Sequence, residues 1–127
     1  MSELAPIAVD RRLPCTTDAP RAARVAAADV LTEIGGGDGR SDDVALIVSE
    51  LVSNAVLHGP DAEVGLSLLA TPSMLRIEVH DEGTIAFELP DGKGAPHRGL
   101  ALATKFSDRI GVMQFPSTVV WCEVDLV

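Results

Sequence analysis

The stretch Ser41-Asp-Asp-Val-Ala-Leu-Ile-Val-Ser-Glu-Leu-Val-Ser-Asn-Ala-Val-Leu-His-Gly59 decides how the rest of this chain is expected to fold. Ser41 is predicted to cap the first free amides of a helix, and Gly59 followed by Pro60 is predicted to end it. At about 100° per residue, the apolar residues between these signals fall on one broad face. They are Val44, Ile47, Val48, Leu51, Val52 and Ala55. The stretch therefore predicts a long helix with one side in the core.

Three polar residues of this helix, Glu50, Asn54 and His58, follow each other at i, i+4 and i+8 and so share one stripe. A carboxylate and an amide set into an apolar helix are costly unless something binds them. The helix alone leaves two interpretations open. In one, Glu50 and Asn54 cap neighbouring backbone at the edge of the core. In the other they form a site, with Glu50 as a general base and the Asn54 oxygen as a ligand for Mg²⁺.

Length and composition restrict the class of protein. The 127 residues predict one domain spanning 1–127 with a real hydrophobic core. A net charge of −9 argues against nucleic acid as a partner, and no apolar run is long enough to predict a membrane span. The N-terminus lacks the pattern of a signal peptide. Cys15 and Cys122 have no metal spacing, so free thiols and a cytoplasmic location are expected.

The segments around the central helix alternate between strand and helix patterns. Thr17 or Asp18 is predicted to cap a first helix. The full predicted order is an edge strand over 5–14, a helix over 20–34, the central helix, strands over 63–69 and 74–80, a loop over 84–98, a short helix over 99–107, and strands over 108–115 and 118–127. This order predicts an α+β fold, a two-layer sandwich of a mixed, mostly antiparallel sheet with helices on one face.

Two further groups of residues suggest chemistry at the ends of these elements. Asp81 could accept a hydrogen bond from an exocyclic amine, and Gly83 would let a planar ring approach the backbone. The alternative for this pair is an ordinary turn at a strand end. The start of the short helix holds Arg98, Gly99 and Leu100. A glycine and free amides at a helix start can bind phosphate. The alternative is an ordinary cap and loop. The pattern is not a Walker loop.

Together these motifs resemble those of the GHKL ATPase superfamily. Glu50-Leu-Val-Ser-Asn54-Ala-Val-Leu-His-Gly is similar to its N box, Val79-His-Asp81-Glu-Gly83 to its first glycine box, and Arg98-Gly-Leu-Ala-Leu102 to its second. The segment Val119-Val-Trp-Cys-Glu-Val124 resembles the last strand of the stand-alone bacterial anti-sigma-factor serine kinases. The resemblance extends over almost the whole chain.

The resemblance implies a nucleotide site and a reaction. Asn54 would hold Mg²⁺, Asp81 would bind adenine N6 of ATP with Gly83 under the ring, and Glu50 would accept the proton of a substrate serine. The loop over 84–98 would be the ATP lid. The phosphates would meet Arg98, Gly99 and Leu100. The substrate would be a STAS-type anti-anti-sigma protein, and the chain would sequester a sigma factor. Members of the family commonly form homodimers, and the sequence leaves the oligomeric state open.

The chain departs from the family pattern at two places. His97 stands where the family often has a glycine, and Gly94 would serve in its place. Alignment on Trp121 puts Val119 where the family has a threonine near the adenine, with Thr118 one residue earlier. These departures motivate an alternative function, a binding module of the same fold that sequesters a partner without phosphotransfer.

Overall fold

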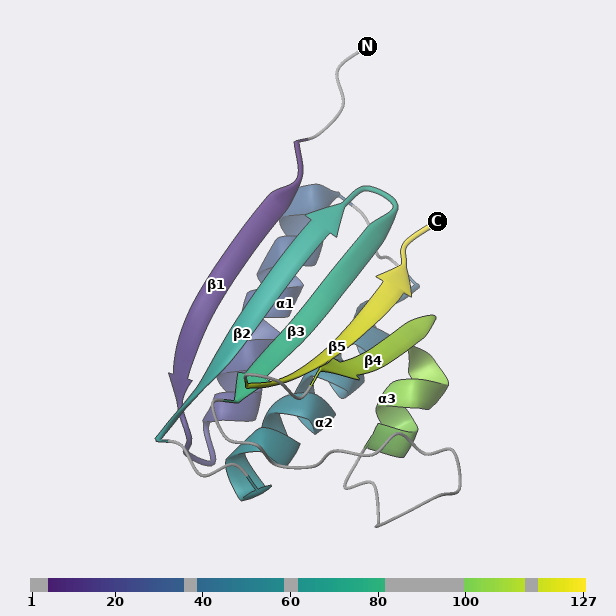
Figure 1. Ribbon diagram of the computed structural model, residues 1–127. Coiled ribbons are helices and arrows are strands. Elements are labelled where there is room, and N and C mark those ends of the chain that lie inside the picture. The colour runs from purple at the N-terminus through teal and green to yellow at the C-terminus, as the bar shows by residue number, and fades with distance from the viewer. Residues whose placement is uncertain (1–4, 36–38, 59–61, 82–99, 114–116) are drawn as a thin grey trace.

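The computed structural model describes residues 5–35, 39–58, 62–81, 100–113 and 117–127. Within them the chain forms β1 (Ile7–Pro14), α1 (Ala19–Ile34), α2 (Ser41–His58), β2 (Glu63–Thr71), β3 (Met74–Asp81), α3 (Leu100–Phe106), β4 (Arg109–Met113) and β5 (Thr118–Asp125). The strands make one sheet in the order β1-β2-β3-β5-β4, and all four pairings are antiparallel. In Figure 1 the helices lie together on one face of this sheet. The predicted α+β sandwich with a mostly antiparallel sheet is confirmed.

The central helix α2 packs as its pattern predicts, because every residue of the predicted apolar face is buried in the core. Its start differs from the prediction by one residue. The N–H of Val44 donates to the Arg40 carbonyl at 2.9 Å, so Arg40 occupies the N-cap position and Ser41 is the first helical residue. Asp42 and Asp43 follow in the first turn, where the helix dipole favours negative charge.

The first helix, α1, has both its ends close to the predicted positions. Asp18 is the N-cap residue, one of the two that the sequence predicted, although its side chain makes no capping hydrogen bond. Pro20 in the first turn suits this start, since proline needs no intrahelical partner for its nitrogen. At the other end Gly35 has a φ of 73° and its N–H reaches the carbonyls of Leu31 and Thr32. A left-handed glycine therefore ends this helix.

The two faces of the sheet differ in chemistry, as the alternation along β3 shows. Leu75, Ile77 and Val79 are buried against the helices. Arg76 and Glu78, between them, are only partly buried on the opposite face, which is called the outer face from here on. Antiparallel sheets commonly pack on a core with one face only. The β1 strand is at one edge of the sheet, as predicted for residues 5–14.

The remaining expectations concern cysteines and membranes. Cys15 and Cys122 are not joined in a disulfide, and burial raises the pKa of the Cys122 thiol to about 12. Among the described residues, no helix is both long and apolar enough to span a bilayer.

Candidate functional site

Asn54 lies four residues before the last residue of α2, with only 2% of its surface exposed. Neither its side-chain oxygen nor its nitrogen has a hydrogen-bond partner among the described residues. Buried amides are almost always hydrogen-bonded, and leaving one without a partner costs about 1–3 kcal/mol. Within the described part of the chain, the side chain does not cap neighbouring backbone. A ligand that binds the Asn54 amide would remove this cost.

The end of β3 and the start of β5 lie at the same end of the sheet as the C-terminal turns of α2 (Figure 1). Asp81 is the last residue of β3, Thr118 is the first of β5, and the two are register partners. Asp81 is 4% exposed and Thr118 is fully buried. Helix α2 contacts both strands. Among the described residues, the buried polar or charged side chains are those of Asn54, Asp81 and Thr118.

The register also decides which residue of β5 belongs to this group. Residues directly opposite each other in an antiparallel pair lie on the same face. Asp81 pairs with Thr118, and the adjacent pair His80 and Val119 therefore lies on the outer face. Alignment on Trp121 favoured Val119 as the adenine-side residue, whereas the fold places Thr118 beside Asp81.

Two more predicted site residues fall within the described structure. Glu50 is partly buried and lies one helical turn before Asn54, so its carboxylate is on the same stripe. Leu100 is the first residue of α3, and its side chain is fully buried in the core. A phosphate contact from Leu100 would therefore come from its backbone and not from its side chain.

The other predicted site residues lie outside the described part of the chain, as does the predicted lid over 84–98. They are Gly83, Gly94, Arg98 and Gly99. The side chain of His58, the third member of the polar stripe, also lies outside the described part. Their roles remain predictions.

The described side chains fit a metal that is held mainly by its nucleotide. No group of three or more His, Cys, Asp or Glu residues within the described part of the chain could hold a metal ion alone. Mg²⁺ usually keeps several waters and binds one or two protein oxygens together with substrate phosphates. The buried Asn54 oxygen matches one such protein ligand.

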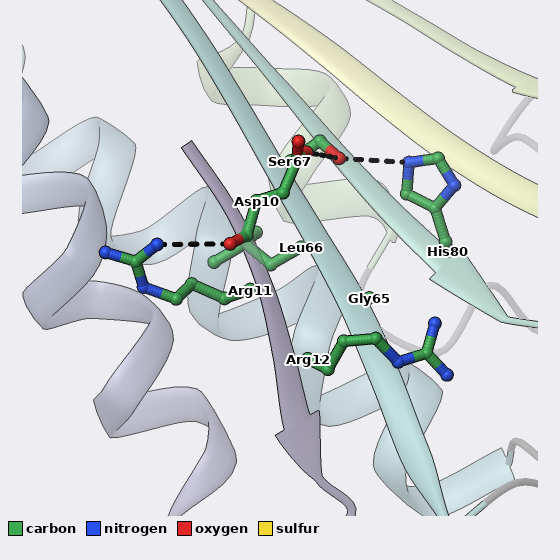
Figure 2. Close-up of a pocket in the computed structure, with 7 residues that line it drawn as sticks. All are labelled: Asp10, Arg11, Arg12, Gly65, Leu66, Ser67 and His80. Atoms are coloured by element: carbon green, nitrogen blue, oxygen red, sulfur yellow. Dashed lines mark hydrogen bonds between the residues drawn. The ribbon is translucent and has the colours of Figure 1, made fainter. Parts of the chain in front are cut away.

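Sequence reasoning did not predict a groove on the outer face, drawn in Figure 2. Its volume is about 260 Å³, and β1, β2 and β3 line it. Among its lining residues the Ser67 hydroxyl donates to Asp10 Oδ1 at 2.7 Å, and His80 Nε2 lies 3.4 Å from the Ser67 oxygen. The polar residues that alternate with apolar ones along β3 were the sequence feature that could have predicted a polar surface here. Because His80 and Asp81 point to opposite faces, this groove is separate from the predicted site.

Comparison with known proteins supports the fold and the family. Over residues 13–121 the chain matches the model of the histidine kinase-like ATPase domain. It superposes on the crystal structure of the RsbU and RsbW domains of Rv1364c from Mycobacterium tuberculosis with a TM-score of 0.72 and 23% identity, covering 97% of this chain and 33% of that one. No curated protein matched.

A second solved structure, the histidine kinase domain of the blue-light activated histidine kinase EL346 from Erythrobacter litoralis, gives a TM-score of 0.51 at 21% identity. The alignment covers 68% of this chain and 44% of that one, so this chain spans less than half the length of either structure. At these identities the two structures support the fold, while the family match carries the assignment. The chain belongs to the family of histidine kinase-like ATPase domains and is, as its motifs predicted, an ATP-binding domain of the GHKL superfamily.

Proposed function

We propose that this chain is an ATP-dependent serine/threonine protein kinase that also acts as an anti-sigma factor. Its substrate would be a STAS-type anti-anti-sigma protein, and its second partner a sigma factor. The observation that carries the proposal is the placement of the buried polar side chains. Asn54, Asp81 and Thr118 come from three elements, lie on the helix-covered side of the sheet, and match the predicted metal and adenine contacts.

Each of these side chains has a separate role in the proposed site. The Asp81 carboxylate would accept a hydrogen bond from adenine N6, with Thr118 beside it on the neighbouring strand. The Asn54 oxygen would bind Mg²⁺, which neutralises charge on the phosphates during transfer. Glu50 would take the proton of the substrate hydroxyl, because it lies one helical turn from Asn54. The predicted glycine-box residues Gly83, Gly94, Arg98 and Gly99 would complete the contacts to the ring and the phosphates.

The choice of this kinase class over other GHKL proteins rests on the motifs and on one structural likeness. The N box reads Glu-Leu-Val-Ser-Asn-Ala, close to the pattern of the anti-sigma kinases, and the structure with the higher TM-score includes an RsbW domain. A single catalytic domain over residues 1–127, located in the cytoplasm, is part of the same proposal. A homodimer is compatible with it.

The deciding experiment combines nucleotide titration with a transfer assay. Calorimetric titration with ATP in the presence and absence of Mg²⁺ should show tighter binding with the metal. Labelled phosphate from ATP should appear on a serine of a STAS-domain protein that co-purifies with the chain. Mg²⁺-dependent ATP binding without transfer to any co-purifying STAS protein would favour the non-catalytic module, and no ATP binding by the folded protein would overturn the proposal.

A further inference from the structure

The side chain of Arg40 bonds to three elements and to Asp108, at the end of the molecule away from the predicted site. Its Nε donates to Asp43 Oδ2 at 3.1 Å, and its Nη1 donates to Asp108 Oδ2 at 3.2 Å. Two backbone carbonyls also accept from it, Phe106 O and Asp125 O, each at 2.9 Å. These groups, here called the Arg40 cluster, connect the start of α2 to the end of α3, the residue before β4, and the end of β5.

The acceptors of the Arg40 cluster are themselves held in place. Asp108 Oδ2 also accepts the N–H of Asp125 at 2.7 Å, and the N–H of Asp108 donates to the Glu123 carbonyl at 2.9 Å. The hydrogen bond from Asp125 lowers the pKa of the Asp108 carboxyl, and Arg40 lowers it further, although burial opposes both. Arg40 is only 26% exposed. A planar guanidinium with several fixed acceptors defines one geometry, which lysine cannot reproduce.

The Arg40 cluster connects two elements that carry residues of the predicted site, α2 and β5. Helix α2 begins next to Arg40 and carries Asn54 near its other end, about 20 Å away at 1.5 Å per residue. Strand β5 runs the opposite way, because Thr118 begins it at the site and Asp125 ends it at Arg40. The two elements are therefore joined by directional bonds at one end, and they carry site residues at the other.

Hydrophobic packing alone would hold α2 less specifically along its axis. The face of α2 that meets the sheet consists of Val, Ile, Leu and Ala side chains, and burial of such surface has no preferred direction. Hydrogen bonds do depend on direction and distance. The bond from Arg40 to the Asp125 carbonyl consequently specifies the position of α2 along β5 in a way that the apolar contacts do not.

We infer that Arg40 is a positioning residue, which sets the axial position of α2 against β5 and so brings Asn54 into register with Asp81 and Thr118. This inference rests on the proposed function, since it concerns how the metal half of the site meets the adenine half. With the cluster broken, Asp81 and Thr118 would keep their strand register, while Asn54 would move relative to them. Adenosine should then bind as before, and the gain in ATP affinity from Mg²⁺ should fall.

The test compares Arg40→Gln with Arg109→Gln as a matched control. Arg109 also hydrogen-bonds two acidic residues of β5, Glu123 and Asp125, but through side chains, without reaching α2 or α3. For each variant, ATP affinity is measured with and without Mg²⁺, and adenosine affinity alone, at a temperature where urea curves show full folding. Arg40→Gln should reduce the Mg²⁺-dependent gain by about 2- to 30-fold and leave adenosine affinity unchanged. Arg109→Gln should change neither.

A purely structural role for Arg40 predicts a different result, in which stability falls but the Mg²⁺-dependent gain stays at the parent value. That outcome would overturn the inference. If Arg40→Gln fails to fold, Arg40→Lys, which keeps the charge but not the planar fork, carries the same comparison. A ligand-free readout separates this inference from the proposed function. The side-chain amide signals of Asn54 in a ¹H–¹⁵N spectrum should shift in Arg40→Gln and not in Arg109→Gln, and unchanged signals would refute the positioning role even if the parent protein bound no ATP.

Discussion

Asp81 and Thr118 face each other as the final register pair between β3 and β5, both buried on the helix-covered side of the sheet. The pairing of β3 with β5 holds the backbone of Asp81 in place. Asp81 ends a regular strand, and the residues after it, which the alternative of a turn at the strand end would involve, lie outside the described part of the chain. A rigid acceptor next to a hydroxyl suits recognition of a planar amine.

Replacement of Asp81 by Asn should weaken ATP binding selectively. The amide must rotate to offer its oxygen to adenine N6, and it adds a donor with no matching acceptor. A site built for an amine should also discriminate against GTP, whose ring presents a carbonyl at that position. Titration of the parent and Asp81→Asn with both nucleotides checks this prediction. Equal affinities of the parent for ATP and GTP would show that Asp81 does not contact the amine.

Replacement of Asn54 by Leu, which has nearly the same shape, should separate stability from ligand binding. The free energy of unfolding without nucleotide should rise by about 1–3 kcal/mol, because the variant no longer buries an amide without a partner. The stabilisation of the protein by Mg-ATP should disappear, while adenosine should still bind. Urea unfolding and thermal shift measure the two effects. A clear loss of stability in Asn54→Leu would instead indicate a structural role for the amide.

The change Glu50→Gln should abolish serine phosphorylation and spare nucleotide binding. Glutamine keeps the size of the side chain and its place on α2, but it cannot accept the proton. Loss of a general base typically lowers the rate by about 10²- to 10⁴-fold. Transfer of labelled phosphate to the STAS partner should be compared with ATP affinity in the parent and the variant. Transfer at the parental rate by Glu50→Gln would remove Glu50 from the catalytic role.

The outer face offers a test of the packing around Trp121, which is the only tryptophan of the chain. A Cβ atom at Gly111 would lie within 2.6 Å of the indole nitrogen, and Arg76 stacks on the ring with its Cζ 4.4 Å from the centroid. Gly111→Ala should therefore cost about 1–3 kcal/mol and shift the tryptophan fluorescence. Gly39→Ala, with open space around its Cβ, is the control and should leave the fluorescence unchanged. Normal stability in Gly111→Ala would show that the indole has room to move.

Stability should also depend on pH through Glu123 on the outer face. Hydrogen bonds from Arg109 and Arg76 lower the pKa of this carboxyl below its ordinary value of 4.5, although burial opposes them. Because the pKa is lower in the folded state, the stabilisation is fully present above about pH 4.5 and is lost as the pH falls through the folded pKa. Urea midpoints measured from pH about 5 to about 3 should fall less steeply in Glu123→Gln than in the parent.

The control for this pH series is Glu63→Gln, whose ion pair with Arg12 joins side chains that are 52% and 59% exposed. Exposed pairs contribute little to stability, so this variant should follow the parent curve. Identical pH dependence in the parent and Glu123→Gln would contradict the prediction.

The sequence by itself predicted the elements of this fold and drew attention to Asn54 and Asp81, two of the three buried polar residues. The apolar spacing of α2 and the alternation in β2, β3 and β5 are local patterns, set by the repeat of a helix or a strand. Such patterns can be recognised in a single sequence. Asn54 and Asp81 were also detectable locally, since a polar residue inside an apolar pattern needs a partner.

Only the tertiary structure decided between Thr118 and Val119 and revealed the role of Arg40. Thr118 and Val119 differ by one position, and a shift of one residue in register moves a side chain to the other face of a sheet. The pairing of β5 with β3 sets that register, although Asp81 and Thr118 are 37 positions apart in the sequence. No local pattern in the sequence singles out Arg40, because its acceptors at Phe106, Asp108 and Asp125 are distant in sequence and meet it only after the sheet and helices have packed.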